Sequence, residues 1–154
     1  MTYEDACFQF LLLKHGFYEQ YDNWFDTLLK EENPLSAETL RLIDCNGDYE
    51  KIAAYLGNIA VDGYDRAAVC EKVRLFFRDE FNSGRLIGKE CAHIMYKISL
   101  HDMNYNNSDE WWPMFNLDDY YGLAETGILK MADFEQALSV YLNTGVYNEY
   151  KIGE

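Results

Sequence analysis

Residues 17–31 read Phe-Tyr-Glu-Gln-Tyr-Asp-Asn-Trp-Phe-Asp-Thr-Leu-Leu-Lys-Glu and have the clearest hydrophobic period in the chain. Their large apolar side chains recur three and four residues apart, which is the spacing of one face of an α-helix. Glu19, Asp22 and Asp26 recur at the same spacing on the opposite side. This helix is therefore predicted to carry an acidic ridge.

The same period returns along most of the chain and predicts an all-α fold. Helices are expected over residues 3–15, 17–31, 37–44, 49–56, 64–82, 88–101 and 131–143. Thr2, Ser36 and Asp48 are expected to cap the first, third and fourth of these, and Gly145 to end the last. Only two prolines interrupt the 154 residues, which favours long helices. The sequence thus predicts one compact domain over residues 1–154, built from about seven helices. Because a short turn joins the helices over 64–82 and 88–101, these two should pack as an antiparallel hairpin.

The stretch from Asp102 to Tyr121 is predicted to be a loop that exposes acidic and aromatic side chains. It holds five carboxylates, six aromatic rings and no Lys or Arg. Asn and Ser side chains between residues 104 and 108 compete for the backbone, and Pro113 disfavours helix at Trp112. Helix is expected to resume only over residues 117–125. The tail over residues 146–152 is compatible with a strand, a helix or a frayed end.

Each feature of this stretch has two interpretations. Trp111 and Trp112 either fill the core or anchor a protein–protein contact, and the pair can also divide, with one ring inward and one outward. The adjacent acids at 109–110 and 118–119 could hold a divalent cation. They are also typical of a solvated surface or a helix cap, and no metal site is predicted. The residues of this stretch that are candidates for contacting a partner are Asp109, Glu110, Trp111, Trp112, Asp118 and Asp119.

The net charge of −14 is unevenly distributed. It amounts to −8 over residues 1–63, +2 over 64–101 and −8 over 102–154. Such a field repels nucleic acid and anionic membranes and attracts a basic partner, although it could also serve solubility alone. The basic middle predicts internal pairing with flanking carboxylates by one or more of Arg66, Arg74, Arg78 and Arg85.

Residues for catalysis are scarce. The chain has three histidines and none of the common nucleophile, phosphate-loop or dinucleotide motifs, so neither an enzyme nor a cofactor is predicted. Asp44-Cys-Asn-Gly-Asp begins like a calcium loop, but Tyr49 stands where the loop needs glycine and Tyr55 where it needs a bidentate Glu. Four cysteines without C-x-x-C spacing are expected to be reduced. An acidic start without a secretory leader favours the cytoplasm.

Small size, strong acidity, the loop of carboxylates and rings, and the missing catalytic motif together resemble bacterial immunity proteins, the cytosolic antidotes of contact-dependent or polymorphic toxins. Ser83-Gly-Arg-Leu-Ile-Gly-Lys-Glu-Cys-Ala also looks like the helix-opening turns common in that class. The resemblance is to a class, and it implies tight, stoichiometric binding to a toxin domain, often a basic nuclease.

The hypothesis from the sequence is therefore a non-enzymatic inhibitor with a basic protein partner. The candidate contacts are those of the acidic aromatic stretch, followed by the ridge of Glu19, Asp22 and Asp26. Two alternatives remain open. One is a phage-type DNA mimic that blocks a DNA-binding protein, with acids at phosphate-like spacing. The other is a small helical enzyme with an unrecognised site, which would show a deep pocket lined by convergent polar groups.

Overall fold

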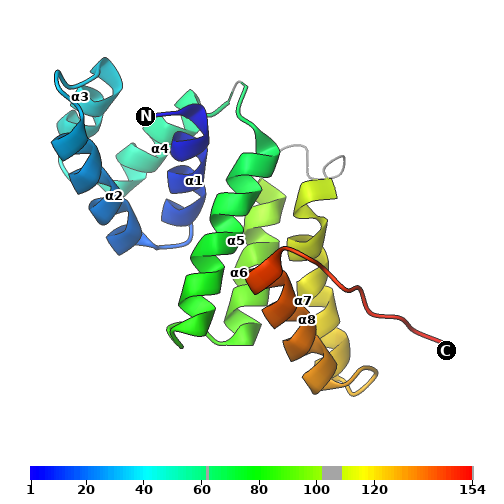
Figure 1. The fold of residues 1–154 in the computed structure, drawn as a ribbon. Helices are drawn as coiled ribbons and strands as arrows, with labels where there is room; N and C mark the ends of the chain where they lie inside the picture. The colour runs from blue at the N-terminus through cyan, green and yellow to red at the C-terminus, as the bar shows by residue number, and fades with distance from the viewer. Residues whose placement is uncertain (62, 102–108, 154) are drawn as a thin grey trace. The chain divides into compact units, whose positions relative to one another are not determined.

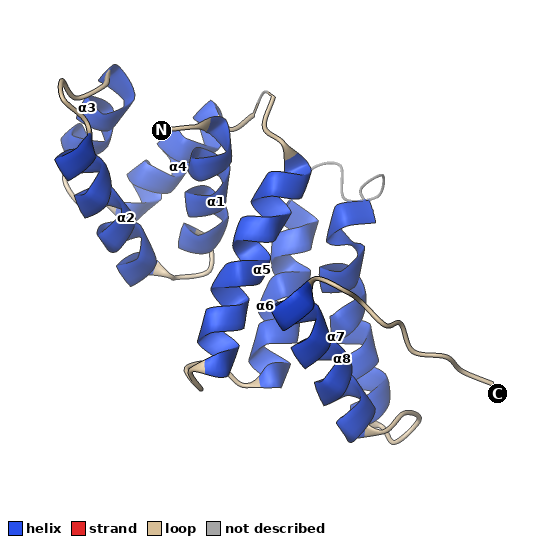
Figure 2. Ribbon diagram, in the orientation of Figure 1, coloured by secondary structure: helices blue, strands red, loops and turns tan. Residues whose placement is uncertain are grey.

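The computed structural model describes residues 1–61, 63–101 and 109–153, so Asp102 to Ser108 of the predicted loop lie outside the described residues. The described residues form eight α-helices and a short 3-10 helix, without a β-strand among them (Figures 1 and 2). This confirms the predicted all-α class and a number of helices close to seven. Contacts divide the chain into two compact units, Met1–Val69 (unit 1) and Cys70–Glu154 (unit 2), each described by itself. That residues 1–154 form a single domain stays a prediction.

Three of the four helices of unit 1 begin after a polar capping residue. Its helices are α1 (Tyr3–Leu13), α2 (Tyr18–Glu31), α3 (Ala37–Asp44) and α4 (Tyr49–Ile59). Thr2, Ser36 and Asp48 precede α1, α3 and α4, and each side-chain oxygen accepts a hydrogen bond from a backbone N–H of the first turn. Such caps satisfy donors that have no partner inside the helix. All three caps match the predicted helix starts.

Helix α1 packs against both α2 and α4, so this nearly all-apolar segment is largely buried. Ala6 and Leu12 are fully buried, and Leu11 is 2% exposed. Gly57 lets α4 approach α1 closely, because a Cβ atom at this position would lie 2.9 Å from the Phe10 ring.

Residues 45–48 form the turn that connects α3 to α4. Asn46 and Gly47 adopt φ angles of 53° and 75°, the left-handed conformation that Asn and Gly tolerate best. One carboxylate oxygen of Asp48 accepts hydrogen bonds from the N–H groups of Glu50 (3.1 Å) and Lys51 (3.3 Å). Asp48 thus caps the N-terminus of α4.

Unit 2 contains a stack of packed helices. The chain enters it within α5 (Arg66–Asn82) and continues through α6 (Gly88–His101), the 3-10 helix η2 (Asp109–Trp111), α7 (Trp112–Glu125) and α8 (Met131–Thr144). Helix α7 packs against α6 and α8. Helices α5 and α6 run in opposite directions from a short turn, as predicted for a hairpin (Figure 1). The fully buried large side chains of unit 2 include Phe77, Met95, Ile98, Trp111, Met114, Leu117 and Phe134.

The prediction that the loop extends to Leu117 is wrong. Helix α7 begins at Trp112, and Pro113 lies in its first turn. Backbone N–H groups of a first turn have no acceptor within the helix, so the missing N–H of proline costs nothing there, and its fixed φ suits the helix. The helix predicted over 117–125 is the C-terminal part of a 14-residue helix.

Arg74 joins α5 to the end of α8. This residue is 8% exposed, pairs with Glu71, and donates from Nη1 to the carbonyl oxygen of Leu142 at 2.6 Å. The last carbonyls of a helix lack intrahelical partners and carry partial negative charge, so a buried guanidinium stabilises this end. Gly145 then ends α8 in the left-handed conformation, as predicted.

The predicted pairing of arginines with flanking carboxylates is wrong for three of them. Arg74 pairs with Glu71, Arg78 with Asp79 and Arg85 with Glu80, all within the basic middle of the chain. A carboxylate a few residues away on the same helix or turn is reached at a small cost in side-chain entropy. These three arginines therefore leave the charge of the flanks in place.

The two neighbouring tryptophans should differ sharply in their effect on stability. Trp111 is 1% exposed and Trp112 is 42% exposed. We expect Trp111→Ala to lower the free energy of unfolding by about 3–5 kcal/mol, because it opens a large cavity. Trp112→Ala should cost about 1 kcal/mol or less. Urea denaturation followed by circular dichroism measures both, and equal losses would contradict the assigned rotation of α7.

The free thiols should differ in reactivity with their burial. All four cysteines lie in the described chain as free thiols, and burial raises the pKa of Cys70 and Cys91 to about 12. At about pH 9.5, iodoacetamide should therefore label the half-buried Cys45 first, and should label Cys70 and Cys91 only in denaturant.

The same thiols make stability depend on pH. Unfolded thiols lose their protons near pH 9, whereas the folded chain keeps them toward pH 12, so the unfolded state binds fewer protons in that window. The free energy of unfolding should fall as the pH rises from about 9, and the Cys70→Ala/Cys91→Ala double variant should show a smaller slope.

In the iodoacetamide experiment, equal labelling of Cys45, Cys70 and Cys91 in the folded protein would contradict their assigned burial.

Candidate protein-interaction surface

Helix α7 places Trp112 and Asp119 on the surface of unit 2. Trp111 just before it, together with Met114 and Leu117, points into the core. Trp112 is 42% exposed, and Asp119, seven residues later, is exposed on the same side of the helix. The two tryptophans thus divide, one inward and one outward. Trp111, predicted as a partner contact, cannot touch a partner in this conformation because it is buried.

Asp109 and Glu110 are exposed in η2, directly before Trp111. The thiol of Cys70 on α5 donates to the backbone oxygen of Glu110 over 3.1 Å. This contact fixes the η2 backbone against α5, while both carboxylates remain at the surface. These two predicted site residues are therefore brought next to Trp112.

A row of aromatic rings supports the exposed indole. Trp112 stacks on Phe115 with a centroid separation of 5.8 Å, and Phe115 contacts Tyr96 of α6 at 5.4 Å. Phe115 and Tyr96 are half-buried. Because this row holds the indole from one side, Trp112 presents a large apolar area whose ordering costs little further entropy on binding.

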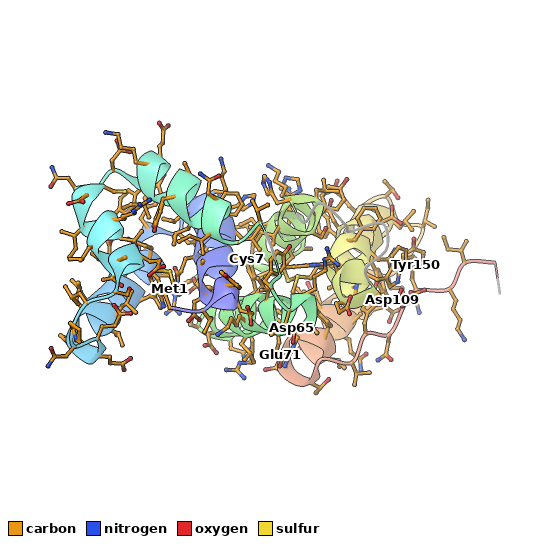
Figure 3. All side chains as sticks on the ribbon, turned by 90° about the horizontal axis from the view of Figure 1, so that it is seen from above. Met1, Cys7, Asp65, Glu71, Asp109 and Tyr150 are labelled. Carbon is orange, nitrogen blue, oxygen red and sulfur yellow. The ribbon has the colours of Figure 1, made fainter. Side chains whose placement is uncertain are left out.

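The chain after α8 crosses α7 as an extended tail, held by side chains (Figure 1). The hydroxyl of Tyr147 donates to Asn116, that of Tyr150 donates to Asp119, and the indole N–H of Trp112 donates to Glu149. The Tyr150 ring also packs edge-on against Tyr120, with centroids 5.2 Å apart. Figure 3 labels Tyr150 and Asp109 on the α7 and tail side of unit 2. We call the exposed residues Asp109, Glu110, Trp112, Asp119 and Glu149, together with the half-buried Tyr150, the α7–tail face.

Neutral donors bind three carboxylates of α7 and the tail. Besides the contacts of Asp119 and Glu149, Glu125 accepts a 2.7 Å hydrogen bond from the Tyr121 hydroxyl. These bonds raise the pKa of Tyr150 and Tyr121, because an adjacent carboxylate opposes the loss of the phenol proton. A phenol or an indole orders a carboxylate without neutralising it. The face therefore keeps its negative charge.

Asp118 lies apart from Asp119. It is half-buried and faces α6, where Nδ1 of His93 is 3.5 Å from its carboxylate. The adjacent acids at 118–119 thus point to different neighbours. In the part of the chain that the structure describes, no group of three or more His, Cys, Asp or Glu side chains could hold a metal ion.

The predicted acidic ridge is exposed on α2 of unit 1. Glu19, Asp22 and Asp26 all lie at the surface, and both oxygens of Asp22 accept hydrogen bonds from the Tyr49 hydroxyl at 2.8 and 2.9 Å. This ridge and the α7–tail face belong to different units. Each is therefore a surface of its own unit.

Sequence reasoning missed Asn116, Tyr147, Glu149 and Tyr150. The weak alternation after Val146 was the only signal for an extended tail, and nothing in the sequence indicates that it crosses α7. The contact depends on side chains 31 and 37 residues apart, which local periodicity does not report.

No protein-family model, curated protein or solved structure matches this chain. Among the described helices, none combines the length and the apolar character needed to cross a membrane.

The tail should lose its order when its first anchor is removed. Tyr147→Ala deletes the hydrogen bond to Asn116 and a ring contact with Tyr141 at 6.2 Å. We expect backbone order parameters over residues 148–151 to fall from about 0.85 to below about 0.6, measured by ¹⁵N NMR relaxation. Ile152→Ala is the matched control, because this side chain is 60% exposed. Unchanged order in Tyr147→Ala would show that the assigned contacts do not hold the tail.

Proposed function

We propose that this protein is a non-enzymatic inhibitor that binds and neutralises a basic toxin domain in the cytoplasm, as bacterial immunity proteins do. The α7–tail face is the contact surface. The observation that carries the proposal is the exposed, stacked indole of Trp112 among exposed carboxylates, in a stretch from residue 109 to 129 without Lys or Arg.

Charge supplies the first step of the proposed binding. Unit 2 has 14 acidic and 8 basic side chains, a net charge of −6. A field of this sign speeds the encounter with a basic domain and rejects acidic competitors. On a nuclease, Asp109, Glu110 and Asp119 would occupy positions that otherwise receive phosphate groups.

The aromatic anchor supplies the second step. Burying Trp112 removes a large apolar area from water, and tryptophan is among the residues that most often dominate interface energies. Asp119 keeps acceptor positions for Arg or Lys beyond the one used by Tyr150, since a carboxylate offers about four. Because Phe115 and the tail already order both groups, slow dissociation follows from contacts that need little rearrangement.

The test is co-purification and calorimetry with the toxin domain, taken as the variable C-terminal domain of a large secreted protein encoded next to this chain. Trp112→Ala should weaken the complex by more than about 2 kcal/mol, and Asp109→Asn/Asp119→Asn should weaken it in a salt-dependent manner. Trp111→Ala is unsuitable as a test because the loss of core packing would confound it.

Two exposed residues of unit 2 serve as controls: Ile128→Ala for an apolar side chain and Glu135→Gln for a charged one. Both variants should retain full affinity. Equal affinity of the Trp112→Ala variant and Ile128→Ala would place the binding surface elsewhere. A complex that does not form at all with the intact chain would remove the proposed function.

A further inference from the structure

Unit 1 exposes one face of a stacked tyrosine pair. Tyr18 at the start of α2 and Tyr49 at the start of α4 lie parallel, with ring centroids 4.2 Å apart and an interplanar angle of 4°. Tyr49 covers one face of the Tyr18 ring, yet Tyr18 is 44% exposed. Its outer face is therefore available as a flat, electron-rich surface.

An ordered carboxylate stands beside this ring. Asp22 lies four residues after Tyr18 and so on the same side of α2. The Tyr49 hydroxyl holds both of its oxygens, at 2.8 and 2.9 Å, and a carboxylate so bound retains further acceptor positions. The bond adds no positive charge. Asp22 is exposed, and its negative charge stays available to a cation.

A buried hydroxyl in the same cluster lacks a partner. Tyr21 is 2% exposed and meets Tyr49 edge-on, with centroids 6.2 Å apart and an interplanar angle of 88°. Its hydroxyl has no hydrogen-bond partner among the described residues. A buried polar group left unpaired is destabilising.

The surrounding charge favours a cation. Glu19 and Asp26 flank Asp22 on α2, and Asp48 and Glu50 stand at the start of α4 with Lys51 as a neighbouring base. Unit 1 as a whole has 13 acidic and 5 basic side chains, a net charge of −8. A positively charged group is thus attracted to this side of the unit.

We propose that Tyr18, Asp22 and Tyr49, the tyrosine platform, bind an arginine side chain from a basic segment of a protein partner. A guanidinium is planar and weakly hydrated, so it can lie flat on the outer face of Tyr18 while the negative charge of Asp22 attracts it. An ammonium group is a compact, strongly hydrated charge that stacks less well on a ring. The platform lies within unit 1, so the proposal for it is tested independently of the proposal for the α7–tail face.

The test is a titration of the full ¹⁵N-labelled chain with a blocked pentapeptide that has arginine at its centre between Gly and Ser residues. Amide signals of residues 18–22 and 49–51 should shift and saturate. The same peptide with lysine should bind at least about twofold more weakly, and the peptide with citrulline, which keeps the shape but not the charge, should not saturate.

Variants then separate the two parts of the platform. Tyr18→Leu should weaken arginine-peptide binding about two- to fivefold through the lost ring face, and Asp22→Asn by a similar factor through the lost charge. Tyr3→Leu and Glu38→Gln are the matched controls, because Tyr3 is 54% exposed on α1 and Glu38 is an exposed carboxylate on α3. Both controls should bind as the unaltered chain does.

Three outcomes would overturn the proposal: equal affinity for the arginine and citrulline peptides, shifts centred outside the platform, or unchanged binding in both Tyr18→Leu and Asp22→Asn. None of these results bears on the complex tested through Trp112. Conversely, loss of toxin binding in the Trp112→Ala variant leaves the peptide titration of unit 1 unaffected.

Discussion

The burial of Trp111 sets the rotation of α7, and the surface of unit 2 depends on that rotation. Consecutive residues of an α-helix point about 100° apart, so a core position for Trp111, Met114 and Leu117 turns Trp112 and Asp119 outward. Pro113 lies in the first turn, where it suits the helix start. A loop at this place would not fix whether each indole is buried or exposed. The helix assigns one to the core and one to the surface.

Neutral hydrogen-bond donors then order two of the exposed carboxylates. Tyr49 binds Asp22 in unit 1, and Tyr150 binds Asp119 in unit 2. An Arg or Lys in these positions would cancel the charge that it orders. A phenol orders the carboxylate and leaves the charge, which suits the proposed role of these surfaces in attracting a basic group. The arginines of the basic middle support the same result, since Arg74, Arg78 and Arg85 pair with carboxylates close to them in sequence.

Local signals allowed most helices to be predicted from the sequence. The apolar period over residues 88–101 matches α6, and Ser36 and Asp48 cap the helices that they were expected to cap. The exposed ridge on α2 followed from the same period. The start of α7 was missed because proline is destabilising inside a helix but favoured in its first turn, and the sequence alone does not say which applies to Pro113. The tail contacts of Asn116 and Asp119 were missed because they join distant residues.

The role of the negative surface is tested most directly by the rate at which the chain associates with a basic toxin domain, measured by stopped-flow fluorescence at increasing ionic strength. If charge on these surfaces steers the encounter, the association rate should fall about tenfold or more between about 20 and 200 mM salt, while the dissociation rate changes little. An association rate that does not change with salt would contradict the account.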